Sequence, residues 1–275
     1  MRHDYNYNSI HQGVSLLMDG GKPYSFDGVL WRPPGVAAYG ARLDEIYRFG
    51  LGFGSIQNRT GATIVCGIGG RVHPTHWKAG QWVNATTTFT DDTVDAQDVG
   101  ANDFPLETLT ANDGFLVASL RPINAICLDI GTAGVGTGPV RTIEYSIAGG
   151  SWAPITNALI PPLAASHWAV GEALILWQHP SDLAPMVAGH GTGVPVGWYG
   201  YRFRSTTPPG TTAAVANSMS VAEIILPIEG LADNNIYEIN PTGEYYLNNA
   251  YDSLVALLSS KAAIQSTVNI DARVL

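Results

Sequence analysis

The chain has 275 residues, of which 13% are charged, and its 23 Asp and Glu against 14 Lys and Arg give a formal net charge of -9. Because phosphate binding needs concentrated positive charge and no cluster of Lys and Arg occurs, a nucleic-acid partner is not expected. The 31 glycines and 17 prolines, among many Ser, Thr and Asn, are typical of a turn-rich β protein.

The beginning of the chain, MRHDYNYNSIHQG, lacks the apolar core of a signal peptide, and no run approaches the roughly 18 apolar residues of a membrane span. We therefore expect a soluble product that is not exported by the ordinary route and has no membrane partner. Cys66 and Cys127 each lie in an apolar, strand-like run. This position predicts buried free thiols rather than a disulfide.

Short apolar runs bounded by Gly, Pro, Asn and Asp follow one another along the chain. In RTIEYSI (residues 141–147) polar and apolar side chains alternate, and in WYGYRFRS (residues 198–205) the aromatic side chains change face about Gly200. Alternation implies one buried and one wet face, so we predict a mainly β fold, an antiparallel jelly roll or β-sandwich in one or two β domains. The predicted strands are residues 27–31, 46–53, 63–68, 115–119, 125–130, 141–147, 173–178, 198–205 and 218–226.

The predicted domain organisation has an arm at each end of the chain. Residues 251–265 (YDSLVALLSSKAAIQ) are predicted to form a C-terminal helix, since Leu254, Leu257, Leu258 and Ile264 make one apolar stripe. We expect both arms to pack on a larger body or on a neighbouring subunit. The four parts are an N-terminal arm (1–25), an N-terminal β region (26–109), a jelly-roll β-sandwich (110–228) and a C-terminal arm (229–275), with the central boundary at the polar turn LETLTANDG.

An acidic stretch, TFTDDTVDAQDVGANDF (residues 88–104), precedes this boundary. A calcium-binding EF-hand loop needs Gly at its sixth position and Glu at its twelfth, but a loop starting at Asp91 has Ala96 and Asn102 there. Nothing in the stretch fixes the separation of two carboxylates as a glycosidase requires. We interpret it as a solvated, turn-rich connection, and an irregular calcium site at Asp91, Asp92 and Asp95 stays open as the alternative.

Other chemical motifs are incomplete, and we predict no catalytic residue, cofactor or metal. His73 and His76 lack the further ligands of a zinc site, and no G-x-S-x-G sequence marks a nucleophile. The glycine strings GIGGRV (67–72) and GTAGVGTGP (131–139) lack the Lys-Ser/Thr ending of a phosphate-binding loop, and we interpret both as hairpin connections.

Residues 82 to 225 or so contain an ordered series of motifs: WVNATTTFTDDT, NDGFLVASLRPINAICLDIGTA, RTIEYSIAGGSWAPIT, SHWAVGEALILWQHP, GVPVGWYGYRFRST and VANSMSVAEII. The series resembles the jelly-roll structural proteins of bacteriophage virions, the head decoration or cement proteins and spike-like proteins. Tyr145, Gly150 and Trp152 match a hairpin pattern of these proteins. A late strand pattern is matched by Pro195, Gly197, Tyr199 and Arg202.

The resemblance implies a non-enzymatic virion protein that is made in the host cytoplasm, binds the outer particle surface through the major capsid protein or another virion protein, and forms a homotrimer through its arms. Head and tail locations both stay open. The alternative is a carbohydrate-binding or receptor-binding module, such as a tail adhesin, because an aromatic face can stack on a sugar ring. Its platform residues are Trp152, Trp168, Trp177 or Trp198. A glycan hydrolase ranks third.

Overall fold

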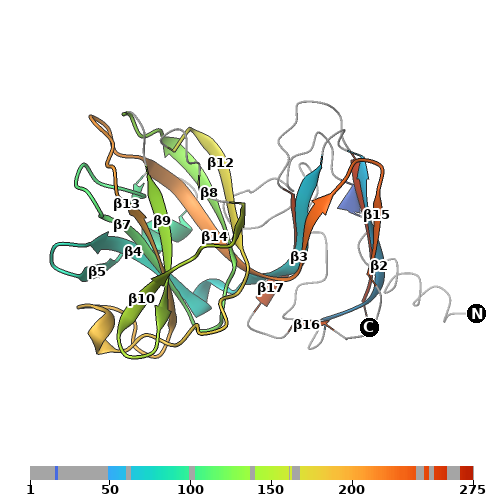
Figure 1. Cartoon of the computed structure of the whole chain (residues 1–275), viewed down its shortest axis with the longest axis horizontal. Helices are drawn as coiled ribbons and strands as arrows, with labels where there is room; N and C mark the ends of the chain where they lie inside the picture. The colour runs from blue at the N-terminus through green and yellow to red at the C-terminus, as the bar shows by residue number, and fades with distance from the viewer. Residues whose placement is uncertain are drawn as a thin grey trace, which may run out of the picture. The chain divides into compact units, whose positions relative to one another are not determined.

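The structure, a computed structural model, describes residues 16–17, 49–59, 63–98, 103–136, 140–160, 162, 168–239, 245–247, 251–258 and 267–274 (Figure 1). The chain divides into two compact units. Unit 2 is residues 74–223, and unit 1 combines residues 1–73 with residues 224–275. Most of the predicted N-terminal arm and the predicted strand at 27–31 lie outside the described residues.

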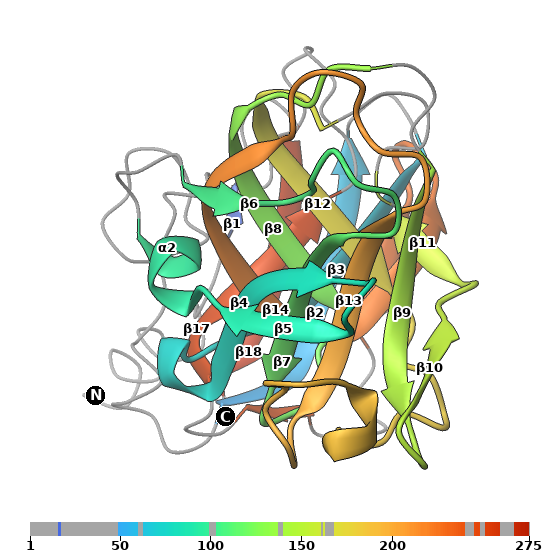
Figure 2. The same cartoon turned by 90° about the vertical axis from the view of Figure 1, so that its left-hand side faces the viewer.

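Unit 2 contains a six-stranded antiparallel sheet with the order β10-β9-β13-β7-β4-β5, which can be followed in Figure 2. Because β4 and β5 precede residue 109 and pair into the same sheet as later strands, the structure does not divide where the sequence predicted, between residues 109 and 110. The strands are β4 (Trp77–Val83), β5 (Thr88–Asp91), β7 (Gly114–Ser119), β9 (Arg141–Ile147), β10 (Ser151–Pro154) and β13 (Tyr199–Ser205).

The second sheet of unit 2 has the order β11-β12-β8-β14, and β6 also pairs with β14. The connection GTAGVGTGP was predicted as a hairpin, but it joins β8 to β9, which belong to different sheets. The strands are β6 (Phe104–Pro105), β8 (Ala125–Thr132), β11 (Ala158–Ile160), β12 (Gly171–Trp177) and β14 (Val215–Leu231), of which residues up to Glu223 belong to unit 2.

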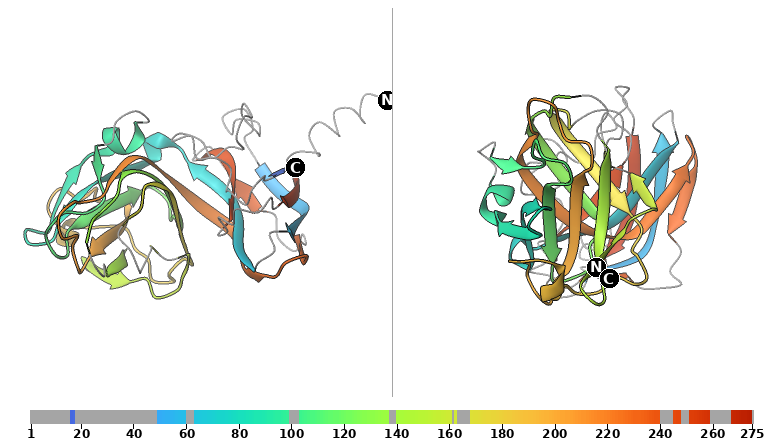
Figure 3. Two further views of the ribbon diagram at one scale, coloured as in Figure 1. Left: turned by 90° about the horizontal axis from the view of Figure 1, so that it is seen from above. Right: turned by 60° about the vertical axis from the view of Figure 1, so that its left-hand side comes forward.

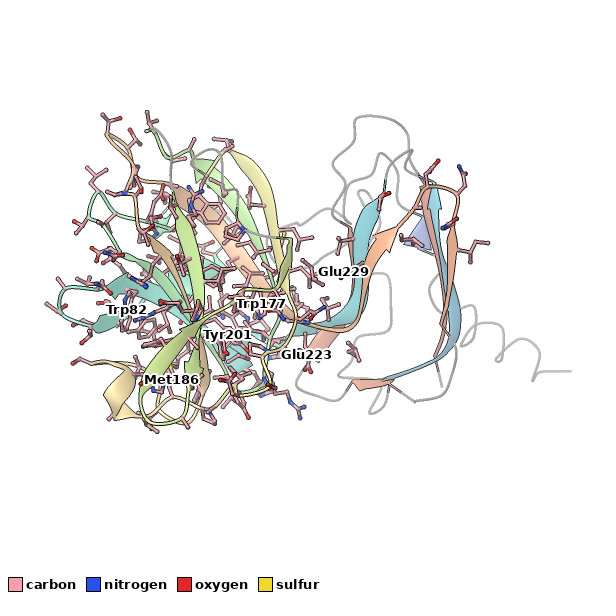
Figure 4. The ribbon with its side chains drawn as sticks, in the orientation of Figure 1. Trp82, Trp177, Met186, Tyr201, Glu223 and Glu229 are labelled. Carbon is pink, nitrogen blue, oxygen red and sulfur yellow. The ribbon has the colours of Figure 1, made fainter. Side chains whose placement is uncertain are left out.

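An aromatic core holds the two sheets together. The Trp177 ring of β12 lies 5.3 Å from the Tyr201 ring of β13 (Figure 4), and Phe115 stacks on Phe203 at 4.5 Å. The Tyr201 hydroxyl accepts a hydrogen bond from the Ile123 backbone N–H at 3.1 Å, so its polar end is satisfied inside the core. Seen from above, the sheets of unit 2 curl around this interior (Figure 3). Unit 2 is therefore an antiparallel β-sandwich.

Unit 1 takes its strands from both ends of the chain. β18 (Thr267–Val274) pairs with β2 (Phe49–Arg59), and β17 (Tyr251–Leu258) pairs with β3 (Ile64–Val72). The glycine string GIGGRV lies inside β3 and is not a hairpin connection. The smaller strands are β1 (Leu16–Leu17), which pairs with β18, and β15 (Ile236–Ile239) and β16 (Tyr245–Leu247), which pair with β2.

The predicted helix is wrong over residues 251–258, which form strand β17; residues 259–265 lie outside the described part. A short apolar run such as SLVALL fits a strand and a helix about equally well. Pairing with β3, more than 170 residues earlier in the chain, supplies the backbone hydrogen bonds and decides between them.

Several sequence predictions are confirmed. The fold is mainly antiparallel β, and the predicted strand at 141–147 coincides with β9. Cys127 is buried, as predicted. The jelly-roll connectivity of the sandwich stays a prediction. Among the described residues, no helix has the length and apolar character needed to cross a bilayer.

Candidate functional site

The outer face of the six-stranded sheet, the face turned away from the aromatic core, is partly covered by the chain itself. Residues 178–198, between β12 and β13, form what we call the covering segment. It contains one short 3-10 helix, η2 (Ala188–His190). Beneath it a second hydrophobic cluster includes Trp82, Phe89, Leu116 and Met186. The sheet therefore has buried apolar side chains on both of its faces.

Hydrogen bonds attach the covering segment to strand β9 on one side of the sheet and to edge strand β5 on the other. On one side, the Ala184 N–H donates to the Ser146 carbonyl at 2.9 Å, and the Ser146 hydroxyl donates to the Ala184 carbonyl at 2.6 Å. On the other side, the Phe89 N–H donates to the Thr192 carbonyl at 2.9 Å. These bonds also satisfy backbone groups along the edge strand β5, which would otherwise offer a template for pairing with another chain.

At two glycines the sheet and its turn come close to the covering segment. At Gly200 on β13, a Cβ atom would lie 2.9 Å from Met186 Cγ and closer still to Met186 Sδ. At Gly150, in the turn between β9 and β10, φ is +82° and a Cβ atom would lie 2.9 Å from the Cα of Gly189. The glycine of the hairpin motif thus lets the turn meet η2.

An ionic cluster lies on the same outer face, because Glu144 on β9 is directly opposite Arg202 on β13. Glu144 accepts hydrogen bonds from Arg202 Nε, from Arg204 Nε at 2.6 Å and from Arg204 Nη2 at 2.7 Å. Burial opposes ionisation of Glu144, but the hydrogen bonds from Arg204 and Arg202 outweigh it and lower its pKa. The carboxylate is therefore held ionised between two guanidinium groups.

Two tryptophan rings flank the Arg202 guanidinium. Its central carbon lies 4.6 Å from the centre of the Trp152 ring and 5.3 Å from that of Trp82. Trp152 is itself fixed, since its Nε1–H donates to the His190 carbonyl at 3.2 Å. Cation–π contacts of this kind stabilise a guanidinium and restrict its motion. Arg202, Trp152 and Glu144 form what we call the outer-face site.

The structure separates the four tryptophans predicted as a glycan platform. Trp168 and Trp177 are buried, with 1% and 0% of their surface exposed, so neither can present a ring to a ligand in this structure. Trp152 and Trp198 are only partly buried, and both pack on the cluster beneath the covering segment. The platform hypothesis is thus reduced to Trp152 and Trp198.

Sequence reasoning matched Arg202 only to a strand pattern and gave no binding role to it or to Glu144. The alternation in RTIEYSI assigns Glu144 to a face of its own strand, and the alternation in WYGYRFRS does the same for Arg202. The missing information was that these two strands are neighbours in register, which is a long-range property of the fold.

The acidic stretch is more ordered than predicted. Its first residues form edge strand β5, and the short helix α2 (Thr93–Gln97) follows, tied to Pro74 through a hydrogen bond of 2.8 Å from Gln97 Nε2. Asp91 accepts a hydrogen bond from Lys78 Nζ at 2.7 Å. Burial and the neighbouring carboxylates, foremost Asp95, raise the pKa of Asp92 to about 6.

These contacts do not favour calcium. Asp91 already has a cationic partner, because Lys78 Nζ lies 2.7 Å from its carboxylate. In the described part of the chain, no three His, Cys, Asp or Glu side chains come together as a metal ion would require. Asp91, Asp92 and Asp95 are therefore not assigned as a calcium site.

The chain matches no protein-family model, no curated protein and no solved structure. The fold and the outer-face site define its class as an antiparallel β-sandwich protein with an arginine held between tryptophan rings on the outside of one sheet.

Proposed function

We propose that the chain is a non-enzymatic structural protein of a tailed-phage virion, a capsid decoration or cement protein that binds the outer surface of the particle and stabilises it. The observation that carries this proposal is the construction of unit 1 from both chain ends, where β18 pairs with β2 and β17 pairs with β3. A unit built from the two chain ends, separate from the β-sandwich of unit 2, suits a protein that attaches to a particle through one unit and exposes the other as a stable β-sandwich. Its partners would be the major capsid protein or another virion protein, with the copies assembled as a homotrimer.

The test is made on particles produced from the phage genome that encodes the chain. Quantitative mass spectrometry of purified particles should find the chain in a fixed ratio to the major capsid protein. Particles made after deletion of its coding sequence should release their DNA at a lower temperature than complete particles. Particles that contain no copies of the chain would contradict the proposal.

The outer-face site favours a second candidate, a carbohydrate-binding or receptor-binding module. Trp152 is partly exposed beside charged side chains, and Trp198 packs on the same cluster. Protein sites for sugars commonly combine an aromatic face with hydrogen-bonding groups fixed by their neighbours. Binding of the purified chain to a glycan array, lost when Trp152→Ala is introduced, would support this function; an array without signal would count against it.

A further inference from the structure

We propose that Arg202 and Trp152 bind the carboxylate-bearing sugar of an acidic glycan, such as a sialic or uronic acid residue. This inference rests on the second candidate function, the carbohydrate-binding module, and names its ligand class. In the proposed complex, Arg202 holds the carboxylate and the exposed part of the Trp152 ring packs against the sugar.

The donors of Arg202 are only partly used within the protein. Among the described residues, its one hydrogen bond runs from Nε to Glu144, so its two terminal nitrogens, with four N–H donors, have no protein acceptor there. The Arg202 side chain is 12% exposed to solvent. A guanidinium fork matches the two oxygens of a carboxylate in a planar, bidentate arrangement. A carboxylate is therefore the ligand group that fits these donors best.

The local charge also favours an anion. Arg202 and Arg204 contribute two positive charges against the single negative charge of Glu144, which leaves +1 on a chain whose net charge is -9. Each nitrogen of Arg204 already donates one hydrogen bond, because Nε and Nη2 donate to Glu144 and Nη1 donates to Asn112 at 3.1 Å. Arg204 donates two hydrogen bonds to Glu144 and Arg202 donates one, so Arg202 is the less compensated of the two cations.

The arginine is held in place before any ligand arrives. Glu144 fixes its Nε, and the rings of Trp152 and Trp82 lie at 4.6 and 5.3 Å from its guanidinium carbon. A long side chain that is already ordered loses little conformational entropy on binding, which favours affinity. Glu144 is accordingly a positioning residue and does not itself contact the ligand.

Trp152 is the reason to propose an acidic sugar rather than another ligand that carries a carboxylate. Its ring is fixed by the hydrogen bond to the His190 carbonyl and by an edge contact with the His190 ring at 5.0 Å. A partly exposed, rigid indole offers apolar area to the C–H face of a pyranose at small entropic cost. The carboxylate of a uronic or sialic acid is bonded directly to a carbon of the sugar ring, so one residue can reach both Arg202 and Trp152, which lie 4.6 Å apart.

The experiment is calorimetric titration of the full chain with sialyllactose and glucuronate oligosaccharides, and with lactose as the neutral counterpart. We expect at least one acidic oligosaccharide to bind about tenfold or more tightly than lactose, corresponding to one charge-assisted hydrogen-bond pair. Arg202→Gln should remove this preference, and Trp152→Ala should weaken binding of both kinds. Arg202→Lys keeps the charge but lacks the fork, so it should retain only a small part of the preference.

Asp91→Asn, which alters an ion pair elsewhere on the same sheet, is the matched control and should leave the titration unchanged. Equal binding of acidic and neutral oligosaccharides would overturn the anion preference while leaving the carbohydrate-binding function in place. Binding of neither kind would overturn both. Equally tight binding of an acidic peptide would overturn the assignment to a sugar. Circular dichroism of each variant establishes that a lost signal does not come from unfolding.

Discussion

Replacement of Glu144 by Gln tests whether the ionic cluster stabilises the sandwich. The wild-type carboxylate accepts three hydrogen bonds from two guanidinium groups, and the side chains of Glu144, Arg202 and Arg204 are only 11%, 12% and 15% exposed. Removing one partner of a buried ion pair costs about 3–5 kcal/mol, because the remaining charge stays buried without compensation. Because the cluster keeps some exposure to water and the amide oxygen of Gln can still accept a hydrogen bond, we expect a loss at the low end of this range, about 3 kcal/mol of unfolding free energy.

The assay is urea unfolding followed by tryptophan fluorescence, which reports on unit 2 because all tryptophans except Trp31 fall within residues 74–223. With a denaturant slope of about 2 kcal/mol per molar urea, a loss of about 3 kcal/mol lowers the midpoint by about 1.5 M. The control is Asp91→Asn, since the Lys78–Asp91 pair has side chains 41% and 43% exposed. An exposed pair of this kind contributes about 0.2–1 kcal/mol. If both variants shift the midpoint equally, the buried Glu144 cluster contributes no more stability than the exposed Lys78–Asp91 pair, and the reasoning is refuted.

Four further predictions follow from the same unit. Gly200→Ala should cost about 1–3 kcal/mol, because its Cβ would overlap Met186, whereas Gly210→Ala, whose Cβ meets nothing closer than 3.8 Å, should be nearly neutral in the same urea assay. Ser146→Ala should lower the free energy of unfolding by about 1–3 kcal/mol and increase amide hydrogen exchange across the covering segment. The reason is that the buried Ser146 hydroxyl donates to that segment and accepts from the Gly200 N–H. Folding lowers the pKa of Glu144, so the ionised carboxylate contributes its full stabilisation above pH 4.5 and loses it as the pH falls through the folded-state pKa. The free energy of unfolding of the wild type should fall over this acidic range, and that of Glu144→Gln should fall less. Burial raises the pKa of Glu223 from 4.5 to about 7, so between these pH values the folded state binds a proton that the unfolded state does not, and stability falls as the pH rises. Glu223→Gln should therefore stabilise the protein at pH 8 by about 1–3 kcal/mol and have little effect at pH 4.

The sequence predicted the strands of the sandwich well because their alternation and turn residues are local. The strand predicted at 125–130 extends to Thr132 in β8, and the one predicted at 198–205 begins one residue later in β13. The helix at 251–258 and the boundary at residue 109 failed for one shared reason. Both depend on which distant strands pair, namely β17 with β3 and β4 with β7, and pairing leaves no local trace in composition or period.

The candidate site shows the same division between local and long-range information. From the sequence, Trp177 lies in the predicted strand 173–178 and Trp152 in a hairpin pattern, and nothing distinguishes a platform residue from a core residue. In the fold, Trp177 meets Tyr201 between the two sheets, while Trp152 lies over Arg202 on the outer face. Strand β13 contributes to both sites, since Tyr201 and Arg202 are consecutive and point to opposite faces. A substitution at Arg202 should therefore affect the ionic cluster and binding on the outside, and one at Tyr201 should affect the core inside, although the two residues are adjacent in the chain.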